Sequence, residues 1–235
     1  MSDRLRTVER NLAAVHDAMA TAAAQAGRSP DDVRLVAVTK YVDTDVVRDL
    51  VAAGCRSLGE SRPQALWEKA DALADLDVEW HLVGHLQRNK VRRTLPAVQL
   101  THSVDSTRLL QEMDREAVNL PRPANVLLEV NISGDAEKHG FAPANVREVV
   151  ERAEKYPHVQ VCGLMTMAHR EGGAEVARRD FAALRRLRDE LVDRAPPNVR
   201  LDELSMGMSN DYPQAILEGA TLIRVGRALY EGVPD

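Results

Sequence analysis

Short apolar runs alternate with amphipathic segments eight times along this chain, and this alternation constrains the fold more than any other feature. The runs are rich in Val, Leu and Ala and are apolar on both faces, as is typical of parallel strands covered on both sides. We therefore predict a parallel sheet. Its strands are expected at residues 34–39, 55–60, 78–84, 98–104, 125–132, 159–168, 201–206 and 221–226.

Each predicted strand leads into a segment with helical spacing of apolar residues. These helices are expected at residues 44–54, 62–75, 87–95, 106–120, 143–156, 174–195 and 211–219, with a helical turn after 226 and a separate helix at 3–26. Eight βα units within 235 residues predict an α/β fold, a (β/α)8 TIM barrel with an extra N-terminal helix, as one domain over 1–235. A doubly wound open sheet is the alternative, although no GxGxxG follows the first strand.

The composition excludes several classes of partner. The net charge of −5 leaves no basic surface for nucleic acid, and 3% aromatic residues leave little for base stacking. No apolar run approaches the length of a membrane span, and MSDRLRTVERNL has no signal core. Cys55 and Cys162 stand far apart with no metal-ligand spacing. We therefore expect a cytoplasmic protein without nucleic-acid or membrane partners and without a metal site.

The strand ends carry the candidate chemistry, because the active site of such a barrel lies at the C-terminal ends of its strands. Loops after strands 7 and 8 often bind phosphate there. Ser205, Ser209 and Gly226, followed by the backbone N–H of Arg227, are suited to this role. The alternative is that Ser209 caps the next helix and Gly226 turns the chain.

Two basic residues stand in or beside strands that are otherwise apolar. Lys40 ends the first strand, where a partly desolvated amine becomes a nucleophile for an aldehyde; it could equally be a solvated strand end. Arg224 shares the inward face of the last strand with Leu222 by strand alternation. It would either form an ion pair with Glu203 or Asp211, or donate to a cofactor ring nitrogen.

The histidines at the third strand do not suggest a metal site. His81 and His85 lie four residues apart, which on a strand separates them by about 13 Å. They cannot share a metal ion as the histidines of a helical HExxH motif do, so we expect a hydrogen-bonding role. Met206 and Met208 are expected to fill core or pocket walls.

An ordered series of motifs resembles one known family. These motifs are VAVTK, GES, WHLVGHLQRNK, HSVDS, EVNISGDAEKHGF, GLMTM, LSMGMSNDYPQAI and the closing IRVGRALYEG. From about residue 30 onward they are similar to the pyridoxal phosphate homeostasis proteins, single-barrel relatives of the N-terminal domain of alanine racemase (fold type III).

The resemblance implies a barrel that holds pyridoxal 5′-phosphate (PLP) as an internal aldimine on Lys40. It implies that Arg224 faces the pyridine nitrogen and that Ser205, Gly226 and Arg227 hold the phosphate. Ser61 and His85 would lie near the ring, and Met206 would shape the pocket. The family usually has Asn at the position of Ser61 and Thr at that of Arg227, so these two contacts are expected to differ.

The resemblance also implies a role in vitamin B6 homeostasis and cofactor delivery to PLP-requiring apoenzymes, by a monomer. Racemases of this fold take a second base from a further domain and a partner subunit, and the chain leaves no length for that domain after the last strand. We therefore expect a cofactor holder with weak or no turnover. A PLP-dependent amino-acid racemase using Lys40, and a barrel enzyme acting on a phosphorylated metabolite, are the alternatives.

Overall fold

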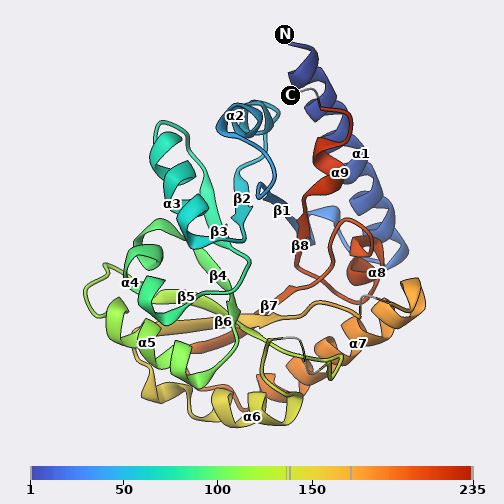
Figure 1. Cartoon of the computed structure of the whole chain (residues 1–235). Helices are drawn as coiled ribbons and strands as arrows, with labels where there is room; N and C mark the ends of the chain where they lie inside the picture. Colours follow the sequence, from blue (N-terminus) through green and yellow to red (C-terminus); the bar gives the residue numbers. More distant parts are fainter. Residues whose placement is uncertain (1, 136, 138, 170, 234–235) are drawn as a thin grey trace.

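A closed barrel of parallel strands forms the centre of the protein, in a computed structural model that describes residues 2–135, 137, 139–169 and 171–233 (Figure 1). Each strand pairs with its neighbour in sequence, and β1 pairs with β8 to close the ring. The predicted barrel is confirmed and the open-sheet alternative is wrong. The strands are β1 (Arg34–Val38), β2 (Ser57–Glu60), β3 (Glu79–Leu82), β4 (Leu100–Val104), β5 (Ala124–Glu129), β6 (Val159–Met165), β7 (Val199–Ser205) and β8 (Leu222–Val225).

Helices surround the barrel and connect successive strands (Figure 1). The α-helices are α1 (Asp3–Gln25), α2 (Thr44–Ala52), α3 (Pro63–Ala72), α4 (Val91–Thr94), α5 (Thr107–Ala117), α6 (Pro143–Glu151), α7 (Gly173–Val192), α8 (Tyr212–Leu217) and α9 (Arg227–Tyr230). Short 3-10 turns are η1 (Pro30–Asp32), η2 (Arg88–Lys90), η3 (Leu95–Ala97) and η4 (Ala153–Lys155). None of the helices in the described part of the chain has the length and apolar character needed to cross a membrane.

Helix α1 packs beside α8 and α9 on the outside of the barrel (Figure 1). Ser2 caps its N-terminus by accepting a hydrogen bond from Leu5 N at 3.1 Å. On its buried face, the Asn11 amide donates to the backbone carbonyls of Leu229 at 3.2 Å and Glu231 at 2.8 Å. The predicted N-terminal helix is therefore part of the folded unit and holds the segment that follows the last strand.

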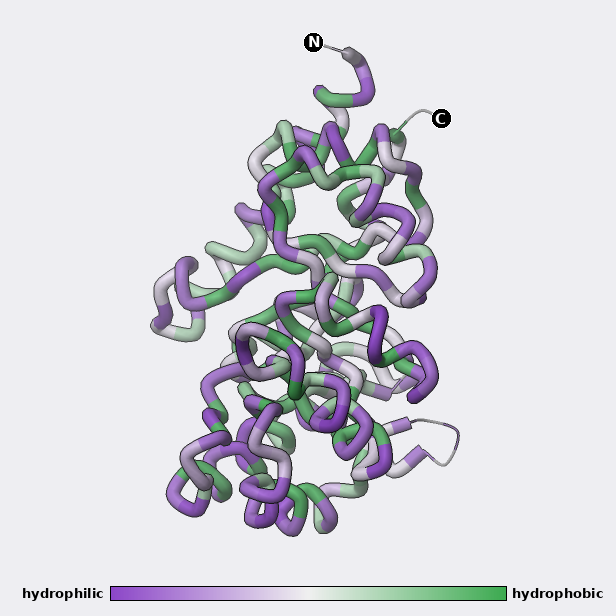
Figure 2. The backbone as a smooth tube through the Cα atoms, turned by 90° about the vertical axis from the view of Figure 1, so that its left-hand side faces the viewer, coloured by the Kyte–Doolittle hydropathy of each residue, from purple (hydrophilic) through white to green (hydrophobic). Residues whose placement is uncertain are grey.

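The apolar residues form two cores. The larger core lies between strands and helices, and hydrophilic and hydrophobic residues accordingly alternate along the helices (Figure 2). The smaller core fills the barrel interior with Val36, Leu100, Leu127, Met165 and Leu222. One alternation step further along β4, β5 and β8, the inward positions become polar, at His102, Glu129 and Arg224. A polar layer thus lies between the apolar interior and the C-terminal mouth of the barrel.

Candidate functional site

Lys40 lies at the mouth of the barrel, two residues beyond β1. β1 ends at Val38, so Lys40 lies in the turn just beyond the C-terminal end of a strand whose Val36 lines the barrel interior. The Lys40 side chain is exposed, with Nζ 4.7 Å from the centre of the Tyr41 ring. The predicted position at the strand end is confirmed, and the amine is accessible from solvent.

A buried ion pair supports the backbone that carries Lys40. Lys69, on α3, donates from Nζ to the carbonyl oxygen of Thr39 at 2.6 Å and lies 3.0 Å from Glu60 Oε1. Glu60 ends β2 and is only 1% exposed, so its charge depends on this partner. Thr39 N also donates to Gly59 O at 2.8 Å. The residue before Lys40 is therefore fixed from two neighbouring elements.

Arg224 lies inside the barrel below the mouth. Its guanidinium donates to Ser205 Oγ at 2.5 Å and to the carbonyl oxygen of Thr166 at 3.0 Å. Burial lowers the pKa of Arg224 to about 10, which still leaves the group charged at neutral pH. Glu203, one of the two ion-pair partners considered for Arg224, instead pairs with Arg34 at the other end of the barrel.

Two neutral histidines continue this network across the barrel. Ser205 Oγ lies 2.8 Å from His102 Nδ1, and His102 Nε2 lies 2.9 Å from His81 Nδ1. Burial lowers the pKa of His81 to about 4 and that of His102 well below its usual range. Since both rings are neutral at neutral pH, one donates and the other accepts across the contact between them. The hydrogen-bonding role predicted for His81 is confirmed.

Glu129 is a member of the polar layer that the sequence analysis missed. It ends β5, is 5% exposed, and follows the inward-facing Leu127 by one alternation step. Burial, followed by the charge of Asp105, raises its pKa to about 7, while Arg224 and His139 act in the opposite direction. A glutamate at the inward position of an apolar strand was the signal that could have identified it.

The loops after β7 and β8 touch one another, as the predicted phosphate site requires. Gly226 N donates to Ser209 Oγ at 3.3 Å. A Cβ atom on Gly226 would lie only 3.1 Å from the carbonyl oxygen of Val38, so the bare backbone fits closely there. Arg227 is exposed beside it, whereas Met206 is fully buried in the larger core. The phosphate contacts themselves stay a prediction.

Ser61 and His85 occupy different surroundings. Ser61 directly follows β2, and its backbone N donates to Glu60 Oε2 at 2.7 Å. His85 lies beyond β3, where Nδ1 is 3.0 Å from Asp105 Oδ2 and the ring stacks on that of His139. Ser61 therefore contacts the Glu60–Lys69 pair that supports the backbone before Lys40, whereas His85 contacts a separate cluster at the mouth.

Comparisons with known proteins identify the family. The chain matches the family described as "Alanine racemase, N-terminal domain" over residues 10–234. The pyridoxal phosphate homeostasis protein of Aquifex aeolicus is 40% identical over 219 residues, covering 93% of this chain and 95% of the relative. This chain belongs to the pyridoxal phosphate homeostasis protein family. The Pseudomonas aeruginosa member is 41% identical over 227 residues, covering 96% of both chains.

Several solved structures share this barrel. PipY of Synechococcus elongatus, solved with PLP bound, superposes with a TM-score of 0.83 at 36% identity, covering 95% of this chain and 99% of PipY. A protein from Bifidobacterium adolescentis superposes with a TM-score of 0.92 at 37% identity, covering 97% of both chains. Alanine racemase from Streptomyces lavendulae superposes with a TM-score of 0.75 at 20% identity, covering 98% of this chain and 58% of the racemase. At this identity the likeness shows the fold alone. The resemblance drawn from the motifs is confirmed.

Proposed function

We propose that this chain binds PLP at the C-terminal mouth of the barrel and serves intracellular vitamin B6 homeostasis by binding, buffering and delivering the cofactor. The observation that carries the proposal is the arrangement on adjacent strands β1 and β8. Val36 and Arg224 are paired in register, and Lys40 and Gly226 follow the ends of these two strands, so both lie at the C-terminal end of the barrel. An amine and a bare backbone stretch thus lie at one end of the barrel, and a buried guanidinium lies on the strand next to β1.

These residues suit the three reactive parts of PLP. Lys40 supplies an exposed amine for the aldehyde. Gly226 and the exposed cation of Arg227 suit a phosphate, with the Ser209 hydroxyl already in contact with the Gly226 amide. Arg224 would face the pyridine nitrogen from inside the barrel. Ser61 and His85 would lie near the ring or its support, and Met206, which is buried in the larger core between strands and helices, would shape the pocket only indirectly through packing.

Ser205 is proposed to act on the cofactor through Arg224. Its hydroxyl is fully buried and lies between the guanidinium of Arg224 and the ring of His102, where it orients both. We therefore propose that Ser205 acts on the pyridine side of the site and that the loops after β7 and β8 bind the phosphate.

The charge of Arg224 favours holding the cofactor over turning over an amino acid. When bound, PLP supplies an aldehyde that captures amines and a ring that accepts electrons. A ring nitrogen beside a fixed guanidinium resists protonation, because two adjacent cations repel. A ring kept unprotonated by Arg224 would be a weaker electron acceptor, so the site would support proton abstraction from an amino acid poorly.

We further propose that the whole chain acts as one cytoplasmic, monomeric binding unit that passes PLP to apoenzymes. The described part of the chain contains no helix able to span a membrane, in agreement with this placement. Sedimentation with and without PLP tests the monomer. Reactivation of a PLP-requiring apoenzyme by the loaded protein, measured against the same concentration of free PLP, tests delivery.

The central experiment locates the cofactor on one lysine. Purified protein incubated with PLP is expected to gain visible absorption, and borohydride reduction followed by peptide mass spectrometry should attach PLP to Lys40. Lys40→Ala should lose both signals. Lys155→Ala, which removes an exposed lysine at η4, is the matched control and should keep them.

Two other outcomes would favour the alternatives. Steady racemisation of L-alanine that is lost in Lys40→Ala would make the protein a racemase. A protein that gains no visible absorption and retains no PLP would remove the cofactor from the proposal altogether.

A further inference from the structure

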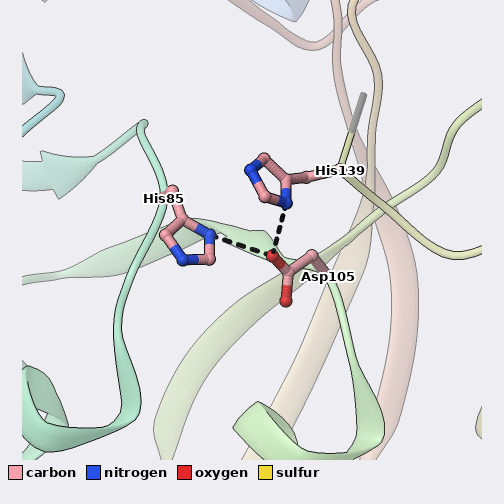
Figure 3. Close-up of side chains that lie close together, drawn as sticks. All are labelled: His85, Asp105 and His139. Carbon is pink, nitrogen blue, oxygen red and sulfur yellow. Dashed lines mark hydrogen bonds and ion pairs between the residues drawn. The ribbon is translucent and has the colours of Figure 1, made fainter. Parts of the chain in front are cut away.

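A second cluster of side chains lies at the barrel mouth, apart from the contacts of Lys40 and Arg224. His85 and His139 direct their Nδ1 atoms toward the same carboxylate oxygen of Asp105 (Figure 3). The three residues come from the loop after β3, the end of β4 and the loop between β5 and α6. In the part of the chain that the structure describes, they form a group whose potential metal-ligand atoms all lie within 4.8 Å of one another.

We propose that His85, Asp105 and His139 form a binding site for a divalent transition metal ion, with Zn²⁺ as the preferred ion. Two imidazole nitrogens and one carboxylate oxygen are typical zinc ligands. Mg²⁺ and Ca²⁺ prefer sites made of oxygen ligands alone, so the two histidines select against them. The contacts of this cluster are separate from those of Lys40 and Arg224, and the metal proposal does not depend on the PLP proposal.

The spacing of the ligand atoms agrees with a tetrahedral zinc ion. With zinc–ligand bonds of about 2.1 Å, neighbouring ligand atoms of a tetrahedron are about 3.4 Å apart. The observed separations from Asp105 Oδ2 are 3.0 Å to His85 Nδ1 and 3.7 Å to His139 Nδ1. The two imidazole rings are stacked, 4.6 Å apart at 19°. Because the lone pair of each Nδ1 lies in its ring plane, one of the two exposed rings has to rotate before both nitrogens point at one ion.

The backbone around two of the ligands is fixed. Asp105 directly follows β4, and its side chain is only 10% exposed. Ser103, two residues earlier, donates from Oγ to Gly84 O at 2.6 Å and so ties the residue before His85 to the same strand. The site is thus partly organised before any ion binds, which reduces the entropic cost of binding.

The position of His139 is also set by its neighbours. Phe141 N donates to the carbonyl oxygen of Glu129, the last residue of β5, at 2.8 Å, and Asn131 N, two residues later, donates to Phe141 O at 2.9 Å. Gly140 has a φ of +115°, and a Cβ there would lie 2.9 Å from Asn131 N, so glycine is required. This anchored turn places His139 over Asp105.

An ion could enter this cluster and keep one coordination position open. Asp105 lines two adjoining grooves of about 610 and 580 Å³, and His85 lines the second of them. The side chains of His85 and His139 are 46% and 63% exposed. Three protein ligands leave a fourth tetrahedral position for water or a small ligand. A bound ion would also tie the loop after β5 to the ends of β3 and β4.

A simple His–Asp ion pair is the competing explanation, and the chain contains internal references for it. His158 lies 3.4 Å from Asp114, and His169 lies 2.9 Å from Asp180. Each of these pairs has one imidazole on one carboxylate. The cluster at the mouth differs because a second imidazole, from a distant part of the sequence, reaches the same oxygen.

The experiment uses untagged full-length protein carrying Lys40→Ala, so that PLP cannot chelate the ion. After treatment with a chelator and its removal, calorimetric titration with Zn²⁺ should show one ion per chain, and Mg²⁺ should show no binding at the same concentration. Co²⁺ should give the visible spectrum of a tetrahedral site. His139→Gln and Asp105→Asn should each weaken Zn²⁺ binding at least about tenfold.

His158→Gln is the matched control, because it removes a histidine from an ordinary His–Asp pair. It should leave Zn²⁺ affinity unchanged. Zn²⁺ should raise the melting temperature of the parent and of this control, but not that of His139→Gln. Because His139 is exposed, its replacement should preserve the fold even if Asp105→Asn misfolds.

Absence of Zn²⁺ binding to the parent, or equal affinity in the parent and His139→Gln, would overturn the proposal. Equal weakening in His139→Gln and His158→Gln would do the same, because it would show binding to scattered surface histidines. Each of these three results would leave the PLP proposal untouched, since the experiment is done without PLP.

Discussion

The buried carboxyl group of Glu129 allows a sharp test of the polar layer, through Glu129→Gln in PLP-free protein. Burial and the nearby charge of Asp105 raise its pKa from 4.5 to about 7, and Arg224 and His139 only partly oppose this. In the unfolded chain the group ionises at its ordinary pKa. The folded state therefore holds a proton that the unfolded state has lost, and stability from this group falls as the pH rises from 4.5 to about 7.

The size of the effect follows from the pKa values. One pKa unit is worth about 1.4 kcal/mol, so a rise from 4.5 to about 7 corresponds to about 3 kcal/mol of unfolding free energy. Glutamine has nearly the same shape but does not titrate. The unfolding free energy of Glu129→Gln, minus that of the wild type, is therefore expected to grow by about 3 kcal/mol across this pH window.

The measurement is urea unfolding followed by circular dichroism at several pH values between about 4.5 and 8. Taking the difference between the two proteins cancels the opposite contribution of His81, whose depressed pKa of about 4 makes stability fall as the pH drops below 6.5. Glu68→Gln, which neutralises an exposed carboxylate on α3, is the matched control. A difference that stays flat with pH for Glu129→Gln would refute the reasoning.

Three further predictions concern the support of the site and its cofactor contacts. Lys69→Met leaves the buried carboxylate of Glu60 without its cation, so urea unfolding should show an unfolding free energy lower by about 3 kcal/mol. The double variant Lys69→Met/Glu60→Gln should regain stability, and an unchanged urea midpoint in Lys69→Met would show that the pair is dispensable. Gly226→Ala places a methyl group 3.1 Å from Val38 O, so the backbone that is expected to hold the phosphate has to shift. Fluorescence titration should therefore show a PLP Kd at least about tenfold higher, or about 1.4 kcal/mol, and an equal Kd would move the phosphate elsewhere. Arg224→Met removes the donor to Ser205 Oγ and Thr166 O and should lower the unfolding free energy, but the folded variant should also shift the visible spectrum of bound PLP. An identical spectrum would count against the place of Arg224 at the ring nitrogen.

Most of the fold could be predicted because parallel barrel strands carry a strong local signal. Every predicted strand is present, and β1, expected at 34–39, runs over Arg34–Val38. Helix boundaries were harder to predict. The helix expected at 87–95 is broken into η2, α4 and η3, and the helix expected at 143–156 ends at Glu151 and continues as a 3-10 turn. Such ends depend on packing against neighbouring elements more than on local propensity.

The candidate site was predictable wherever a strand end carried an unusual residue. Lys40 and Arg224 stand out in the sequence because cations are rare in apolar strands, and the structure places both at or below the mouth. The surroundings of His85 were not predictable in this way. Its partner His139 lies on a distant loop, and nothing in the local pattern of either residue indicates that they share Asp105.

The sequence by itself determined the eight βα units and the face on which each strand residue lies, because alternation along a strand and helical spacing are local properties. Only the tertiary structure decided that Arg224 bonds to Ser205, that Glu129 lies in the same polar layer, and that two distant histidines meet one carboxylate. The reason is physical. Closing the barrel brings inward residues of different strands within hydrogen-bonding distance and removes them from water, and both the contacts and the shifted pKa values arise from that closure.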